Sequence, residues 1–452
     1  MSKVIGIDLG TTFSAIASLD DLGNPEVLAS IEDNRKITAS AVYLKDNEVI
    51  VGDKALNYLK DQSNNVILQT KREMENDVVY STDEGKWVTD KDLVDAYTPA
   101  QVSSLILKKL KEYTSDVKKV VITVPAMFAE KARQATLDAA KIADLEVIEL
   151  INEPTAAVLH YASLPGVEVG GRVMIFDLGG GTFDVTFAEV KNKKVDVMTS
   201  RGDKYLGGRD FDKEITKLMK KKYFDVHNVE IDIENNKEYI HKAEEVKKIL
   251  SVKDKANIEI TGPKGPQKIE ITQEEFEESI QTYIEKIKML IEEAMEASGM
   301  NPSRINQTLL VGGSTRMPII TKVLTQMMGK PPVKGVNVDE AVVCGAAIYA
   351  GLKTEKETLS DQQQEALKEV NLTDVCNFYM GTLAYVTDSH TGRRVVANTI
   401  IIERDTKLPV SVTKRYTTIS EGQEELECNV TQSEGPEDNK EFVNIIHEEM
   451  LK

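Results

Sequence analysis

Cysteine, net positive charge and long apolar runs are all scarce in this chain of 452 residues. Its three cysteines, Cys344, Cys376 and Cys428, are odd in number, far apart and without the spacing of metal ligands. We therefore expect free thiols and a cytoplasmic protein, because disulfides persist mainly in oxidising compartments. No apolar run approaches the length of a membrane span. The first apolar strand begins so close to Met1 that we also expect no signal peptide.

Acidic side chains outnumber basic ones, 74 to 56, which gives a net charge of −18. Nucleic acids and anionic membranes attract basic surfaces, so this balance argues against either as the main partner. The length leaves room for two or three domains with substantial cores.

The strongest motif is a short apolar run, Val173–Phe176, which predicts a buried strand and is followed by Asp177, three glycines at 179–181 and Thr182. Glycines at a strand end leave backbone N–H groups open to phosphate oxygens. Asp177 and Asp184 would repel a polyphosphate unless Mg²⁺ lay between them, since this cation takes carboxylate and water oxygens. From this stretch alone, an ordinary β-hairpin with a glycine-rich turn is the alternative.

A second copy of this order lies near the N-terminus, where an apolar strand runs into Asp8, Gly10, Thr11 and Thr12. Two copies predict two related lobes that face each other, with a nucleotide in the cleft between them. Neither copy contains Gly-x-x-x-x-Gly-Lys-Ser/Thr or Gly-x-Gly-x-x-Gly, which excludes the P-loop and the Rossmann fingerprint. The pair resembles the superfamily of actin, sugar kinases and heat-shock ATPases.

The pattern of the chain changes after residue 352. Residues 353–370 are polar and helix-prone and indicate a connector. From Asn371 onward, short β-type runs separated by turn residues predict a small all-β domain, a β-sandwich or part of one. Before the change, Thr272 and Glu275 form a capping box that opens a helix, and Gly299 ends it.

Taken together, these stretches resemble the seventy-kilodalton heat-shock (DnaK-type) chaperones. The resemblance implies an α/β fold: a duplicated actin-like (ribonuclease H-like) ATPase domain at 1–352, two lobes around a nucleotide cleft, then a linker at 353–370 and a truncated β-sandwich substrate-binding domain at 371–452. The motifs that carry it are Ile7–Thr12, Asn152–Ala157, Asp177–Asp184, Gly207–Gly208 and Gly312–Arg316, with a weaker match at Ile401–Thr406.

The resemblance also implies roles for single residues. Asp8, Glu153 and Asp177 would hold Mg²⁺ against the phosphates, largely through its waters. Lys71, otherwise an unremarked surface lysine, would stabilise charge on the γ-phosphate as water displaces ADP, a reaction in which positioning and electrostatics dominate. Thr11, Thr12, Gly180, Gly181 and Thr182 would cradle the phosphates, with Thr182 also catalytic. The other residues implied to bind the nucleotide in this region are Gly10, Phe13, Gly179, Gly207 and Gly208.

The nucleoside would be held by two further groups of residues. Glu244, Lys247, Lys248 and Ser251, one turn apart on a helix, would form the ribose and adenine side. An ordinary solvated helix face with i,i+3 and i,i+4 pairs is the alternative for this group. The opposite side would be closed by Gly312, Gly313, Ser314, Arg316 and Asp339.

Several positions depart from the family pattern. Lys248 stands where an arginine usually stacks on adenine, so we expect weaker stacking. The linker segment Val370–Val375 carries Asn371 and Thr373 where the family has an apolar run ending in Asp-Val, which puts interdomain coupling in doubt. Glu149 stands where many members carry a basic residue, and this predicts a poor response to a generic J-domain partner. The chain ends at Lys452, before the usual helical lid, and both a naturally short protein and a shortened one are open.

The resemblance predicts an ATP-dependent chaperone that uses ATP/ADP and Mg²⁺ and binds unfolded or extended apolar peptides. Its further partners would be a dedicated J-domain co-chaperone and a nucleotide exchange factor, with no nucleic acid and no membrane. One alternative is a nucleotide-binding, chaperone-like interaction module whose ATPase is slow or uncoupled. A small-molecule kinase of the same superfamily is the other.

Overall fold

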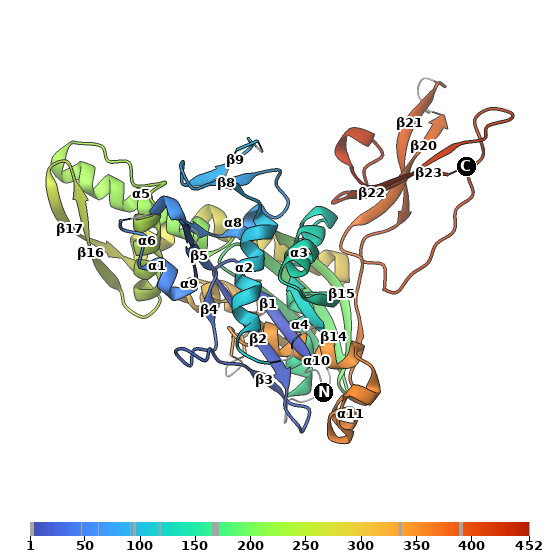
Figure 1. Cartoon of the computed structure of the whole chain (residues 1–452), viewed down its shortest axis with the longest axis horizontal. Helices are drawn as coiled ribbons and strands as arrows, with labels where there is room; N and C mark the ends of the chain where they lie inside the picture. Colours follow the sequence, from blue (N-terminus) through green and yellow to red (C-terminus); the bar gives the residue numbers. More distant parts are fainter. Residues whose placement is uncertain are drawn as a thin grey trace.

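The computed structural model describes residues 4–46, 48–61, 63–90, 92–93, 96–115, 117, 119–164, 171–333, 337–387 and 392–451. Two lobes lie side by side, and a β-rich C-terminal part extends from them (Figure 1). The α/β fold predicted from the sequence is therefore confirmed. Met1 and Lys452, the outer limits of the predicted domains, lie outside the described residues.

Lobe I is built on a sheet with the order β12-β11-β1-β2-β3, in which β2 also pairs with β4. β1 is antiparallel to β2 and parallel to β11. The elements of this lobe are β1 (Ile5–Leu9), β2 (Phe13–Leu19), β3 (Pro25–Val27), β4 (Thr38–Ala39), β5 (Ala41–Lys45), β6 (Glu48–Val51), α1 (Asp53–Leu56), β7 (Val66–Leu68), the 3₁₀ helix η2 (Thr70–Glu73), β8 (Val79–Ser81), β9 (Lys86–Val88), β10 (Ala96–Tyr97), α2 (Pro99–Lys111), β11 (Lys119–Val124), α3 (Glu130–Ile142), β12 (Glu146–Asn152) and α4 (Glu153–Ser163).

Lobe II repeats this plan with the order β18-β13-β14-β15-β19. β13 is antiparallel to β14 and parallel to β18, as β1 is to β2 and β11. The elements are β13 (Gly171–Leu178), β14 (Phe183–Lys191), β15 (Lys194–Asp203), α5 (Gly208–His227), α6 (Lys237–Leu250), β16 (Lys255–Gly262), β17 (Gly265–Thr272), α7 (Gln273–Ser279), α8 (Gln281–Ser298), β18 (Gln307–Val311), α9 (Pro318–Met328), α10 (Ala341–Lys353), α11 (Asp361–Leu367) and β19 (Asn371–Thr373).

Two buried helices join the lobes, because each one packs against the sheet of the other lobe. α4 packs against β13, β14 and β15 of lobe II, whereas α10 packs against β1, β2 and β11 of lobe I and against α4. The helices cross at Gly345, where an added Cβ would lie 1.8 Å from the carbonyl oxygen of Ala156. Glycine is therefore required at this crossing, and the two lobes share one core.

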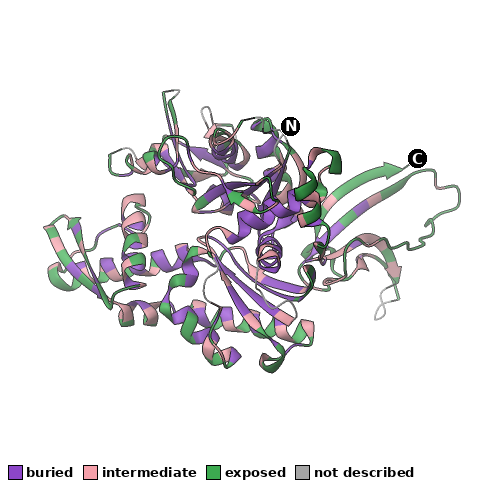
Figure 2. Ribbon diagram, turned by 90° about the horizontal axis from the view of Figure 1, so that it is seen from below, coloured by how far each residue is buried: buried purple, intermediate pink, exposed green. Residues whose placement is uncertain are grey.

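The C-terminal part is all-β, as predicted. Its strands are β20 (Tyr379–Thr387), β21 (Arg394–Ile402), β22 (Leu426–Ser433) and β23 (Asn444–Leu451), which form one antiparallel sheet in the order β21-β20-β22-β23. Figure 2 shows much more exposed surface on this sheet than on the two lobes. Among the helices that the structure describes, none is long and apolar enough to span a bilayer.

The connector at 353–370 is folded rather than extended. Ser360 caps α11, and Leu359 and Leu367 are buried in the core shared by the lobes. The side-chain amide of Gln363 donates to the carbonyl oxygen of Asp20, 2.9 Å away, in lobe I. The segment that follows, β19, joins lobe II as a parallel strand beside β15.

Candidate active site

The cleft between the lobes holds a cavity of about 460 Å³. Its walls come from the turn after β1, η2, the start of α4, the turn after β13, the end of α6 and the turn after β18. Of the residues predicted to contact nucleotide, phosphate or Mg²⁺, those that line it are Asp8, Gly10, Thr11, Thr12, Phe13, Lys71, Glu153, Asp177, Gly179, Gly180, Thr182, Glu244, Lys247, Lys248, Ser251, Gly312, Gly313, Ser314, Arg316 and Asp339.

The two glycine-rich turns face each other at the base of this cavity. A Cβ on Gly180 would lie 2.0 Å from Oγ1 of Thr12, and one on Gly181 would lie 2.4 Å from Oγ1 of Thr11. Any larger residue would push the turns apart, because backbone and hydroxyl groups already touch there. Backbone N–H and hydroxyl groups from both lobes therefore surround the same part of the cavity.

Three of the predicted glycines do not line the cavity but support the turn from behind. The carbonyl oxygen of Gly181 accepts from Nε of Arg72 at 3.0 Å, and a Cβ on Gly207 would lie 2.7 Å from the carbonyl carbon of Gly181. The backbone N–H of Gly208 donates to the carbonyl oxygen of Gly179 at 3.0 Å. They therefore support the turn that carries Gly179 and Gly180.

A buried cluster of acids surrounds Lys71. The Lys71 ammonium pairs with Glu153, and Oδ1 of Asp8 accepts a hydrogen bond from the hydroxyl of Thr123 at 2.8 Å. Burial raises the pKa of Asp8 and of Glu153, and Lys71 opposes this rise in both. Burial and the neighbouring acids raise the pKa of Asp177 well above its ordinary value.

The single positive charge of Lys71 does not balance the carboxylates of this cluster. Oδ2 of Asp177 and Oδ1 of Asp184 are buried and have no hydrogen-bond partner among the described residues, and burial raises the pKa of Asp184 to about 7. Within the described ranges, no three His, Cys, Asp or Glu side chains gather closely enough to ligate a metal ion directly. The oxygens of Asp177 and Asp184 without a partner fit a hydrated divalent cation, which takes carboxylate and water oxygens.

The side of the cavity predicted for the nucleoside is tied together by ion pairs. Lys248 pairs with Glu244 at 2.7 Å and lies over the ring of Phe13, 5.6 Å from its centroid, across the cleft. Opposite, the Arg316 guanidinium donates two hydrogen bonds to the Asp339 carboxylate, at 2.8 and 2.6 Å. The helix face that carries Glu244 thus points into the cavity rather than only into solvent.

The sequence interpretation missed a buried pair that links the lobes. Arg72 of lobe I donates to both carboxylate oxygens of Asp210 in lobe II, at 3.2 and 2.5 Å, and its Nε donates to the carbonyl oxygen of Gly181 at 3.0 Å. Asp210 also accepts from the N–H of Gly207 at 2.9 Å, as in a capping box. The spacing of Gly207 and Asp210 was the available signal for this box. Arg209 and Asp212 line the cavity and were missed as well.

The linker reaches the acid cluster through one side chain. The carboxylate of Asp374 accepts from the amide of Asn152 at 3.1 Å and from the hydroxyl of Thr155 at 3.2 Å, on either side of Glu153. Arg133 donates to Asn152 at 2.7 Å. The polar residues of the linker do not prevent docking, because β19 pairs with β15 through its backbone.

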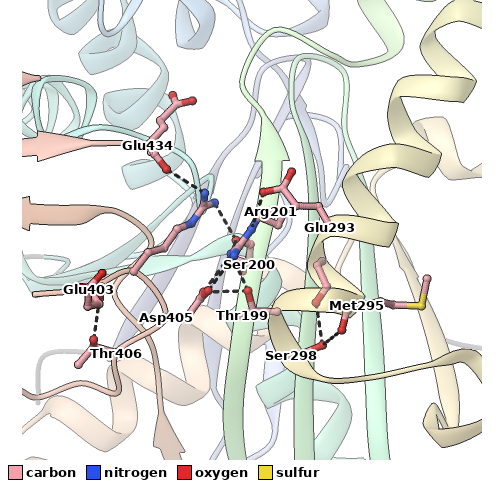
Figure 3. Close-up of polar contacts among 12 residues, drawn as sticks. Thr199, Ser200, Arg201, Glu293, Met295, Ser298, Glu403, Asp405, Thr406 and Glu434 are labelled. Carbon is pink, nitrogen blue, oxygen red and sulfur yellow. Dashed lines mark hydrogen bonds and ion pairs between the residues drawn. The ribbon is translucent and has the colours of Figure 1, made fainter. Parts of the chain in front are cut away.

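A second contact joins the C-terminal sheet to lobe II (Figure 3). The guanidinium of Arg201 donates to both carboxylate oxygens of Asp405, at 3.1 and 2.9 Å, and to Glu293 at 2.9 Å. Asp405 also accepts from the hydroxyl of Thr199 at 2.8 Å. The Arg201 side chain is only 9% exposed, so these bonds are shielded from water.

Glu149 of β12 is held by two side chains of α10. Tyr349 donates its hydroxyl proton to Glu149 at 2.7 Å, and Lys353 pairs with the same carboxylate at 2.7 Å. The acid is therefore part of an internal network, and its charge is partly compensated.

Comparison with known proteins agrees with this architecture. A family model described as "Hsp70 protein" matches residues 4–445. The chain is 35% identical over 454 residues to the "Chaperone protein DnaK" of Thermotoga neapolitana, a match that covers 96% of this chain and 71% of that relative.

Proposed function

The chain belongs to the Hsp70 family of ATP-dependent chaperones, and from this premise we propose that the cleft between its lobes binds Mg-ATP and hydrolyses it there. The observation that carries this proposal is the contact of the two glycine-rich turns beside the buried Lys71–Glu153 pair. Backbone N–H groups, hydroxyls and one ammonium meet there, which are the groups that stabilise a phosphoryl transfer.

Asp8, Glu153 and Asp177 would hold Mg²⁺ through its waters, and the cation would neutralise charge on the phosphates. The partnerless Oδ2 of Asp177 supports this assignment. Thr11, Thr12 and the glycines of both turns orient the phosphate chain, with Thr182 at the end of the second turn. Lys71 stabilises the charge that develops on the γ-phosphate as water attacks.

We further propose that the C-terminal sheet binds extended apolar peptides under control of the nucleotide. Two connections support this coupling: Asp374 contacts residues on both sides of Glu153, and Asp405 holds the sheet to lobe II through Arg201. These links favour a coupled chaperone over an interaction module with an uncoupled ATPase. Membership of the Hsp70 family excludes the small-molecule kinase.

A J-domain co-chaperone and a nucleotide exchange factor complete the proposed cycle. An acid stands at position 149, where many members of the family carry a basic residue, and Tyr349 and Lys353 hold it in place. We therefore expect that a generic J-domain protein stimulates this chain weakly and that a dedicated one is needed. A cytoplasmic location stays a prediction.

The test is hydrolysis of Mg-ATP by the unaltered chain and by Asp177→Asn, each with Mg²⁺ and with EDTA. The unaltered chain should lose hydrolysis in EDTA, and Asp177→Asn should be at least about 10-fold slower with Mg²⁺ because its cation is held less well. The exposed acid Asp138, changed to Asn, is the matched control and should leave the rate unchanged. Equal rates for all three proteins would contradict the assignment.

A further inference from the structure

One basic side chain of the cleft, that of Arg209, is uncommitted: it makes no hydrogen bond or ion pair with the described residues. The cavity is lined by five basic side chains, Lys71, Arg209, Lys247, Lys248 and Arg316. Four of them hold a carboxylate at ion-pair distance. In the part of the chain that the structure describes, Arg209 makes no side-chain hydrogen bond or ion pair, and its Nε is buried without a partner.

The backbone of Arg209 is fixed to the second glycine-rich turn. Its N–H donates to the carbonyl oxygen of Gly180 at 2.9 Å, next to the bond from Gly208 to Gly179 at 3.0 Å. Its side chain lines both the main cavity and an adjoining interlobe cavity of about 410 Å³, whose shared walls include Thr12 and Glu244. Arg209 therefore lies between the glycine-rich turns and the proposed ribose side.

The two acids that interact most strongly with the charge of Arg209 are already engaged. Asp212 pairs with Lys247 at 2.7 Å, and Glu244 pairs with Lys248 at 2.7 Å. Burial lowers the pKa of the Arg209 guanidinium, although Asp212 and Glu244 partly offset this. Such a group gains from an added anion, and the planar fork of arginine matches the oxygens of a phosphate.

We propose that Arg209 binds the phosphate chain of the nucleotide and makes the cleft select nucleoside di- and triphosphates over nucleosides. This inference rests on the proposed function and deepens it, since it assigns a specificity-determining residue that the glycine-rich turns and Lys71 do not include. The feature that carries it is the uncommitted Arg209 in the cavity that Gly180 also lines.

The test is calorimetric titration of ADP and of adenosine into the full chain, its Arg209→Gln and Arg209→Lys variants and a matched control. The control is Arg35→Gln, because Arg35 is exposed, pairs with Asp53 at 2.6 Å and lines only the adjoining cavity. Charge-assisted hydrogen bonds predict that Arg209→Gln weakens ADP binding by about 10- to 100-fold and adenosine binding by less than about 2-fold. Arg209→Lys should fall between, and Arg35→Gln should match the unaltered chain.

The outcomes separate this inference from the function on which it rests. If the unaltered chain binds ADP and Arg209→Gln binds it equally well, the inference is overturned and the proposed function stands. If Arg209→Gln weakens ADP and adenosine alike, Arg209 supports the fold of the cleft and does not read phosphate, which also overturns it. Failure of the unaltered chain to bind ADP would overturn both.

Discussion

Lys71 is the residue on which the proposed chemistry depends most. We expect Lys71→Ala to lower the rate of single-turnover hydrolysis of Mg-ATP by about 100-fold. The change removes the ammonium that pairs with Glu153 in the cleft and that would stabilise charge on the γ-phosphate. ADP affinity should change much less, since the two glycine-rich turns remain. Rapid-quench measurement of the γ-phosphate released in one turnover checks this.

Lys60→Ala is the control for Lys71→Ala, because Lys60 is an exposed lysine away from the cleft. It should hydrolyse ATP at the rate of the unaltered chain. Hydrolysis by Lys71→Ala at that same rate would show that the lysine has no part in the reaction.

His160 on α4 gives a prediction about stability. Burial lowers the pKa of His160 to about 4, so between about pH 6.5 and 4 the unfolded state binds a proton that the folded state does not. The free energy of unfolding should therefore fall as the pH falls through this window, by about 2 kcal/mol between pH 7 and 5 from this group alone.

His160→Gln should remove that part of the pH dependence. Denaturant unfolding at several pH values measures it as a difference in slope, which does not depend on the stability of the variant at neutral pH. The matched control is the exposed His447, changed to Gln. Parallel pH profiles for His160→Gln and the unaltered chain would contradict the assignment.

Single residues also show where sequence reasoning stops. Asp8 and Asp177 could be predicted from two similar stretches, because each lies at the end of an apolar strand and is followed by glycine and threonine. Lys71 has no such local signal, and only the family resemblance suggested it. Arg209 was passed over because its lack of a partner depends on Asp212 and Glu244 being engaged by lysines, which a linear sequence does not reveal.

At the scale of elements, local patterns predicted strands and caps better than breaks. The capping box of Thr272 and Glu275 is present, and Gly299 ends the helix with a left-handed backbone. The predicted single helix is nevertheless two, α7 and α8, because it breaks at Ile280. A buried Ile280 fits the apolar stripe equally well in a broken helix, so the periodicity gave no sign of the break.

The linker strand β19 carries the prediction at this scale. We expect Asp374→Ala to leave the amide of Asn152 and the hydroxyl of Thr155 without this acceptor, which costs about 1 to 3 kcal/mol at the docking site. The linker should then detach more often. Basal hydrolysis should stay within about 3-fold, and its response to peptide should shrink toward none.

Limited proteolysis at the linker and the ratio of hydrolysis rates with and without peptide test this together. Glu369→Ala, a change of an exposed acid just before β19, serves as control. A normal peptide response in Asp374→Ala would show that the contact of the linker with the flanks of Glu153 transmits nothing.

At the scale of the whole molecule, the sequence predicted the parts but not how they meet. Two lobes, a cleft and an all-β C-terminal part followed from repeated motifs and from the change in pattern after residue 352. The exchange of α4 and α10 between the lobes, and the docking of the sheet through Arg201 and Asp405, join residues far apart in the chain. Such contacts have no local signature, because they depend on how finished elements pack.

Peptide binding by the C-terminal sheet should change the rate of hydrolysis in the nucleotide cleft. The most direct measurement is single-turnover hydrolysis of Mg-ATP with and without an unfolded apolar peptide, in the unaltered chain and in Asp405→Ala. We predict that peptide accelerates hydrolysis in the unaltered chain. The acceleration should be much smaller in Asp405→Ala, which loses its bonds to Arg201 and Thr199. Hydrolysis that proceeds at the same rate with and without peptide in the unaltered chain would contradict the account, since it would mean an ATPase uncoupled from its β-sheet.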